Sequence, residues 1–96
     1  MSPLNKKKLN LIRVKLDKID NSLINIIKKR TLLVKKVLLL KDHKNQIVDK
    51  KRIKFILNQI RKKSLKSKID PRITNRIWKN MIWSYIYFEK RKFKKR

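Results

Sequence analysis

The chain has no cysteine among its 96 residues. This absence excludes disulfides, thiolate zinc sites and thiol nucleophiles together. The single histidine, His43, stands in a polar stretch with no second histidine to share a metal ion, so we interpret it as a solvated loop residue. No apolar run reaches the roughly 20 residues of a membrane span, and the N-terminus lacks the apolar segment of a signal peptide. We therefore expect a soluble, cytoplasmic protein without a metal site.

Glycine and alanine are also absent, while lysine, isoleucine and asparagine are abundant. The missing residues have G/C-rich codons and the favoured ones A/T-rich codons, so genomic base bias explains the net charge of +25 as well as selection for charge does. Such a charge otherwise suggests binding to nucleic acid or to an anionic membrane. The basic residues are spread from Lys6 to Arg96, as on a solvated surface. We therefore do not expect nucleic acid as a partner.

The apolar residues of 9–42 follow one another in alternating steps of three and four, which predicts one seam along a helix of about 50 Å. A chain this short cannot bury so long a seam alone, so we expect a second copy to cover part of it. Arg30 interrupts the seam. Its guanidinium cannot lose its proton, so it requires an anion or a route to water. The other seam residues are Leu9, Ile12, Leu16, Ile19, Leu23, Ile26, Leu33, Val37 and Leu40.

Two shorter helices are predicted after the connector 42–46. Asp49 is a suitable N-cap for a helix that extends to about Lys63. Asp70 and Pro71 form a second start signal, for a helix that extends to about Phe93. The predicted fold is all-α, with one long and two shorter helices per chain in an intertwined homodimer. We assign residues 1–8 to a basic lead-in, 9–93 to the helical domain and 94–96 to a basic tail.

Glu89, the only glutamate, lies on the predicted inward face of the third helix. The simplest interpretation is a carboxylate paired with a nearby lysine. Lys41 follows Arg30 by 11 residues, which places the two on nearly the same helical face. Arg30, Lys41 and Glu89 are thus three inward-leaning ionisable residues in an apolar pattern, and a small dianion between them would satisfy Arg30.

Over residues 9–93 the chain resembles the all-helical chorismate mutases, the AroQ class. An arginine with a following apolar and acidic segment opens the pattern, and a second arginine comes 17 residues later. A lysine, an Asp-x-x-Arg segment, an Asp-Pro helix start and a final Gln or Glu complete it. The matching residues are Arg13 with Leu16, Ile19 and Asp20, then Arg30, Lys41, Asp49 to Arg52, Ile69-Asp70-Pro71 and Glu89.

The resemblance implies that chorismate is rearranged to prephenate without a cofactor, in a two-fold dimer whose sites each receive the first arginine from the partner chain. It implies that three arginines bind the carboxylates of the substrate, that Lys41 donates to a carboxylate and to the ether oxygen, and that Glu89 also donates to the ether oxygen. Asp49 and Tyr85 belong to the same implied substrate site. The three arginines are Arg13, Arg30 and Arg52.

Two positions depart from the family pattern. Ile53 stands where many members have a glutamate that binds the substrate hydroxyl, and Tyr85 stands where a small polar residue is common. Related isochorismate-pyruvate lyases tolerate such residues, so isochorismate is an alternative substrate. A basic helical protein that binds nucleic acid is the non-enzymatic alternative, motivated by the charge.

Overall fold

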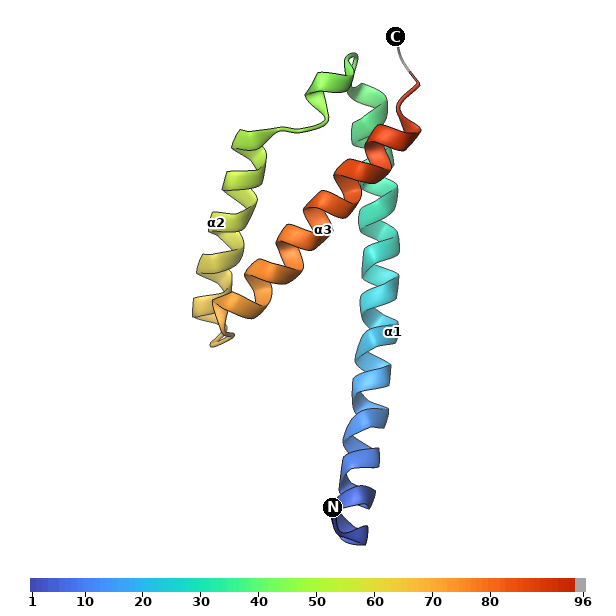
Figure 1. Ribbon diagram of the computed structural model, residues 1–96, viewed down its shortest axis with the longest axis vertical. Helices are drawn as coiled ribbons and strands as arrows, with labels where there is room; N and C mark the ends of the chain where they lie inside the picture. Colours follow the sequence, from blue (N-terminus) through green and yellow to red (C-terminus); the bar gives the residue numbers. More distant parts are fainter. Residues whose placement is uncertain (95–96) are drawn as a thin grey trace. The chain divides into compact units, whose positions relative to one another are not determined.

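The computed structural model of the chain describes residues 1–94, which fold into helices without any strand. The elements are α1 (Pro3–Leu40), a 3-10 turn η1 (Lys44–Gln46), α2 (Lys50–Lys66) and α3 (Pro71–Lys92) (Figure 1). This confirms the prediction of an all-helical chain with one long and two shorter helices. The chain divides into two compact units, Met1–Leu33 and Val34–Arg96, and each is described by itself. Of the predicted tail 94–96, residues 95 and 96 lie outside the described part.

The first unit is a single helical segment that begins earlier than the apolar pattern predicts. α1 begins at Pro3 and not at Leu9, so most of the basic lead-in 1–8 is helical. The reason is local, because the Ser2 hydroxyl accepts a hydrogen bond from the Asn5 backbone N–H at 3.2 Å. A serine N-cap followed by proline at the first helical position is a strong start signal. This start signal does not depend on an apolar helix face, so apolar periodicity does not detect it.

The predicted seam of this unit is largely solvent-exposed within one chain. Ile12, Leu16 and Leu23 are each about half exposed, and so are the other seam residues of the helix up to Leu33 except Leu9 and Arg30, which are partly exposed. An exposed apolar stripe of this kind is typical of an interaction surface.

The second unit has a small apolar core. Leu38, at the end of α1, packs with Ile47 of the connector and with Ile82 and Ile86 of α3. Partly buried residues of α2 and its approach complete the cluster together with Phe93. Asp49 caps α2 as predicted, since its carboxylate accepts from the Arg52 backbone N–H at 3.0 Å. The residues packed around the core are Val48, Ile53, Ile56, Leu57 and Phe93.

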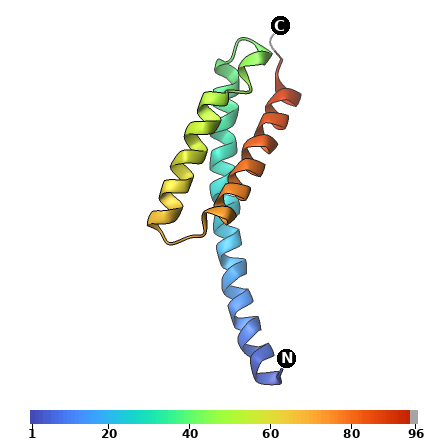
Figure 2. The same ribbon diagram turned by 60° about the vertical axis from the view of Figure 1, so that its left-hand side comes forward.

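α2 and α3 contact each other and form a helical hairpin (Figures 1 and 2). Near its closed end the hydroxyls of Ser64 and Thr74, both buried, lie 2.7 Å apart. The backbone N–H groups of Ile69 and Lys68 donate to the carbonyls of Ser64 and Leu65, a Schellman ending of α2. Lys68 adopts a left-handed conformation, with φ of 58°, at the position where such an ending usually has glycine. A chain without glycine must place another residue there.

Candidate functional site

The site forms around a partly buried ion pair between Lys41 and Glu89. The Nζ atom of Lys41 lies 3.1 Å from Oε1 of Glu89, and the two side chains are 18% and 7% exposed. Nζ also donates to the backbone carbonyl of Ile47 at 3.4 Å. The prediction that these two residues lean inward is therefore correct, and the lysine that pairs with Glu89 comes from another element.

The fold explains why this carboxylate is buried. Glu89 follows Ile86 by three residues, so both share the face of α3 that meets the apolar core, and Phe93, the C-cap residue, packs against the same core. A buried carboxylate is costly unless it is paired and hydrogen-bonded. Lys41 meets this requirement because it lies directly after α1, where the connector turns toward the core.

Asp49 and Arg52 lie one turn apart at the start of α2. The Asp49 carboxylate is an N-cap acceptor. The Arg52 guanidinium lies over the Phe55 ring, with 5.2 Å between its central carbon and the ring centroid. This cation–π contact holds the side chain along the exposed surface of α2. Asp49 thus already has a structural role, while the charge of Arg52 remains accessible to an anion.

Tyr85 is partly buried one turn before Glu89 on α3. Its position four residues before Glu89 places it on the same side of the helix. Ile53, on α2, packs against the apolar core of the second unit. Position 53 therefore presents no polar group to a ligand and contributes to folding instead.

Arg13 and Arg30 belong to the first unit and are described separately from the residues above. Arg13 is exposed on α1, whereas Arg30 is partly exposed within the apolar seam. Their separation along this one helix is 17 residues, or about 25 Å. The structure thus brings Lys41 and Glu89 together, and it places Arg13 and Arg30 on α1 without joining them to this pair.

An open hollow of about 480 Å³ lies beside the first turn of α2. Its lining includes Asp49 but neither Lys41 nor Glu89, so we do not assign the substrate to it alone. Within residues 1–94, no three His, Asp or Glu side chains gather in a group that could hold a metal ion. None of the described helices is both long and apolar enough to cross a membrane. The residues lining the hollow are Gln46, Val48, Asp49, Lys50 and Lys51.

Sequence reasoning missed the Ile47 carbonyl, the second acceptor for the Lys41 ammonium. Every residue has a backbone carbonyl, so no side-chain pattern identifies one that contacts a site. The available signal was the apolar pair Ile47-Val48 in a polar connector, which suggests that the backbone there turns inward. Ile47 is in fact the most buried apolar residue of the core, at 3% exposure.

The family model for chorismate mutase type II matches residues 12–90. No curated protein and no solved structure matches the chain. The family match covers most of the sequence and includes Arg13, Arg30, Lys41, Arg52 and Glu89. The chain therefore belongs to the chorismate mutase type II family, the isomerases that rearrange chorismate to prephenate.

Proposed function

We propose that this chain carries out the chorismate mutase reaction at a site in which Lys41 and Glu89 face the ether oxygen of the substrate. Arg30 and Arg52 of the same chain, with Arg13 of a second chain, bind the two carboxylates. Asp49 and Tyr85 complete the walls of the site. The catalytic domain is residues 9–93, and we expect the protein to act in the cytoplasm without a cofactor.

The observation that supports the proposal most strongly is the Lys41–Glu89 pair. An ammonium has three N–H donors. Two N–H groups of the Lys41 ammonium are directed at the Glu89 carboxylate and the Ile47 carbonyl, which leaves the third N–H group for a ligand. Acceptors from two elements hold the ammonium in place before substrate arrives, so little reorganisation is needed when charge develops on the breaking C–O bond.

The rearrangement needs no covalent intermediate, so the protein has two tasks. It must hold a flexible dianion in its compact conformer, and it must stabilise negative charge on the ether oxygen. Arginine suits the first task because its planar fork matches a carboxylate. Lys41 suits the second because its charge lies in a partly desolvated position, where it interacts more strongly than in water.

The first unit supports the proposal of a homodimer. Arg13 and Arg30 differ by about 25 Å along α1 and by about 100° around it, so both cannot contact one small ligand from the same helix. The exposed seam supplies an apolar surface for a second copy. In a two-fold pair, Arg13 of each chain would reach the site of the other, and two equivalent sites would result.

The direct test is a spectrophotometric assay of chorismate loss with identification of the product. Prephenate is the expected product, and Lys41→Ala should lower kcat by about 100-fold or more, the scale seen when one preorganised donor is removed. Lys44→Ala, in the exposed connector, is the matched control and should retain activity. Equal activity in the two variants would contradict the assignment of Lys41.

The apolar packing of Ile53 motivates a second candidate, isochorismate-pyruvate lyase activity. With no polar group at position 53, the hydroxyl of the substrate has one partner fewer to recognise it. The same assay with isochorismate, in which salicylate is the product to detect, separates the two activities. Prephenate from chorismate with no salicylate from isochorismate would eliminate the lyase.

A further inference from the structure

Trp83 and Tyr87 lie on the side of α3 that faces away from the core. They are 42% and 56% exposed, and their ring centroids lie 6.3 Å apart at a tilt of 41°. The buried residues of α3 lie about 80–160° around the helix from the line through the two rings; they are Thr74, Ile82, Ile86 and Glu89. The outward side of a surface helix is normally polar. Two aromatic side chains in contact there form a surface that nothing in the proposed mutase site uses.

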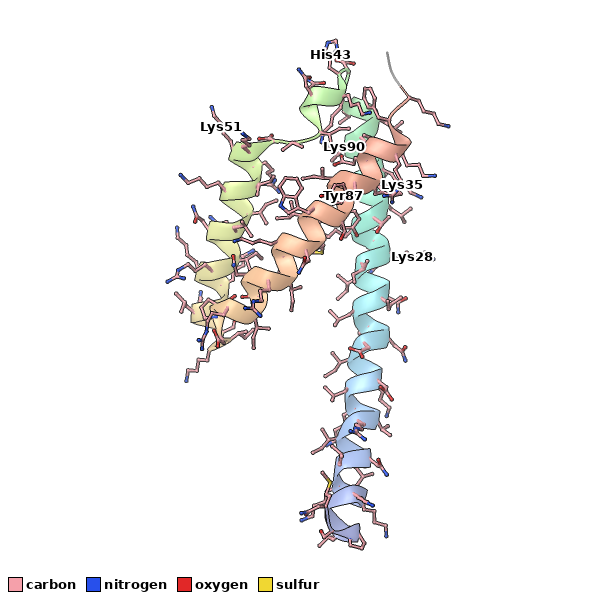
Figure 3. All side chains as sticks on the ribbon, in the orientation of Figure 1. Lys28, Lys35, His43, Lys51, Tyr87 and Lys90 are labelled. Carbon is pink, nitrogen blue, oxygen red and sulfur yellow. The ribbon has the colours of Figure 1, made fainter. Side chains whose placement is uncertain are left out.

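Basic residues flank these rings along the same face. At 100° per residue, Arg76, Lys79, Lys90 and Arg91 fall within about 60° of the line through the two rings. All four are exposed, and Figure 3 labels Lys90 and Tyr87, which are three residues apart on α3. From Arg76 to Lys90 the face extends about 21 Å. Its charged groups are all positive, because Glu89 is the only acid of α3 and it is buried.

Base composition does not account for this arrangement. An A/T-rich bias explains lysine and tyrosine, whose codons are A/T-rich. It disfavours tryptophan, whose one codon contains two guanines, just as it disfavours the missing glycine and alanine. An exposed tryptophan therefore stands against the bias that explains the charge.

We propose that this face of α3 binds single-stranded nucleic acid. We name it the aromatic–basic stripe, and it consists of Arg76, Lys79, Trp83, Tyr87, Lys90 and Arg91. Unpaired bases stack on the two rings, and the phosphates between and beyond them contact the cations on either side. Stacking requires an exposed base face, which a duplex hides within its own stack, so the stripe selects single strands.

Other occupants fit the stripe less well. A second copy of this chain would bring more positive charge, because the chain carries +25. Partial insertion into a lipid surface needs a broad apolar helix face. Here the polar residues Asn80 and Ser84 are exposed beside the rings, and cations lie at both ends. The ligand that complements the stripe therefore combines negative charge with flat aromatic rings.

The first experiment measures binding of a fluorescently labelled oligothymidine of about 12 nucleotides to the full chain, by anisotropy at two salt concentrations. Trp83→Ala and Tyr87→Ala should each weaken binding about tenfold, the scale of one lost base stack. Phe55→Ala removes another exposed aromatic, on α2, and should leave binding unchanged. Equal binding by all three variants would mean that only general charge attraction operates, and the proposal would fail. Unchanged chorismate turnover by Trp83→Ala shows that the variant is folded.

The second experiment uses Trp78→Phe, which leaves Trp83 as the only tryptophan. The oligonucleotide should quench the Trp83 emission, and the matching duplex should quench it much less. Three results would overturn the proposal. The first is a Trp83 emission that the oligonucleotide does not quench. The second is a blue shift of that emission with anionic phosphatidylserine vesicles that the oligonucleotide cannot reverse. The third is shielding of Trp83 from acrylamide in the free protein, which would indicate that another chain covers the stripe.

Discussion

The Nζ atom of Lys41 lies 3.1 Å from Oε1 of Glu89, and this contact joins the residue after α1 to the last turn of α3. The two residues are 48 positions apart in the sequence, so only the fold brings them together. Both side chains are mostly removed from solvent, and each satisfies the charge of the other. The pair therefore links the integrity of the second unit to the chemistry proposed for it.

Lys41→Met should destabilise the fold by about 3 kcal/mol, because it leaves the Glu89 carboxylate buried without its cation. The double variant Lys41→Met/Glu89→Leu should be more stable than the single one, since no unpaired charge remains. Urea unfolding at neutral pH measures these two variants and the single variant Glu89→Leu. A double variant whose loss equals the sum of the two single losses would show that the pair is not coupled.

Glu89→Gln tests whether Glu89 donates to the ether oxygen or only orients Lys41. In the substrate-free protein the carboxylate accepts from Lys41. An amide N–H can donate to the ether oxygen, whereas the side chain of leucine cannot. Glu89→Gln should therefore retain turnover that Glu89→Leu loses, as measured by chorismate loss. Equal turnover in the two variants would show that Glu89 is not a donor.

Mixing Arg13→Ala and Arg30→Ala chains should restore activity that neither variant has alone. An equal mixture of two-fold dimers gives half mixed pairs, each with one intact site, so about a quarter of native turnover is expected. Chorismate loss before and after subunit exchange measures it. Dimers that exchange subunits yet stay inactive would contradict a site shared between chains.

Lys68→Gly should stabilise the fold by about 1 kcal/mol, because a residue with a Cβ pays a cost in the left-handed region that glycine does not. For a domain of this size the expected rise in Tm is about 4–8 °C. Ser67→Gly is the control, since Ser67 has φ of −89° and should gain nothing. Thermal unfolding by circular dichroism distinguishes them.

The Asp70→Asn variant should be less stable than the native chain at neutral pH, and the two should have the same stability in acid. The Arg72 side chain donates to the Asp70 carboxylate and lowers its pKa, and the Arg72 backbone N–H lowers the same pKa further. Because the folded state binds this proton less readily than the unfolded one, the stabilisation is complete above the ordinary carboxyl range and is lost as pH falls through the lowered pKa.

Asparagine retains an N-cap oxygen, so the cap itself should survive the substitution. Melting curves recorded at about pH 7 and about pH 2.5 separate the effect of the charge from that of the cap. A gap in Tm that persists in acid would show that the charge of Asp70 contributes nothing.

Much of the fold was predictable because its signals are local. Asp49 and Asp70 both cap helices as their positions indicate, and α3 begins at Pro71 as predicted. The start of α1 was misplaced because the prediction relied on apolar periodicity, while Ser2 and Pro3 start the helix by hydrogen bonding and backbone geometry. α2 extends to Lys66, beyond its expected end, because Lys68 accepts a left-handed conformation.

The sequence alone determined that Lys41 and Glu89 lean inward, since each occupies an apolar face at helical spacing. It also determined the positions of Arg13 and Arg30 on one long helix, because rise and rotation per residue are constant. Only the tertiary structure decided that Lys41 pairs with Glu89, that Ile47 supplies the second acceptor and that Ile53 belongs to the core. Those contacts depend on how separate elements pack, and a backbone carbonyl or a buried neighbour has no signature in the order of residues.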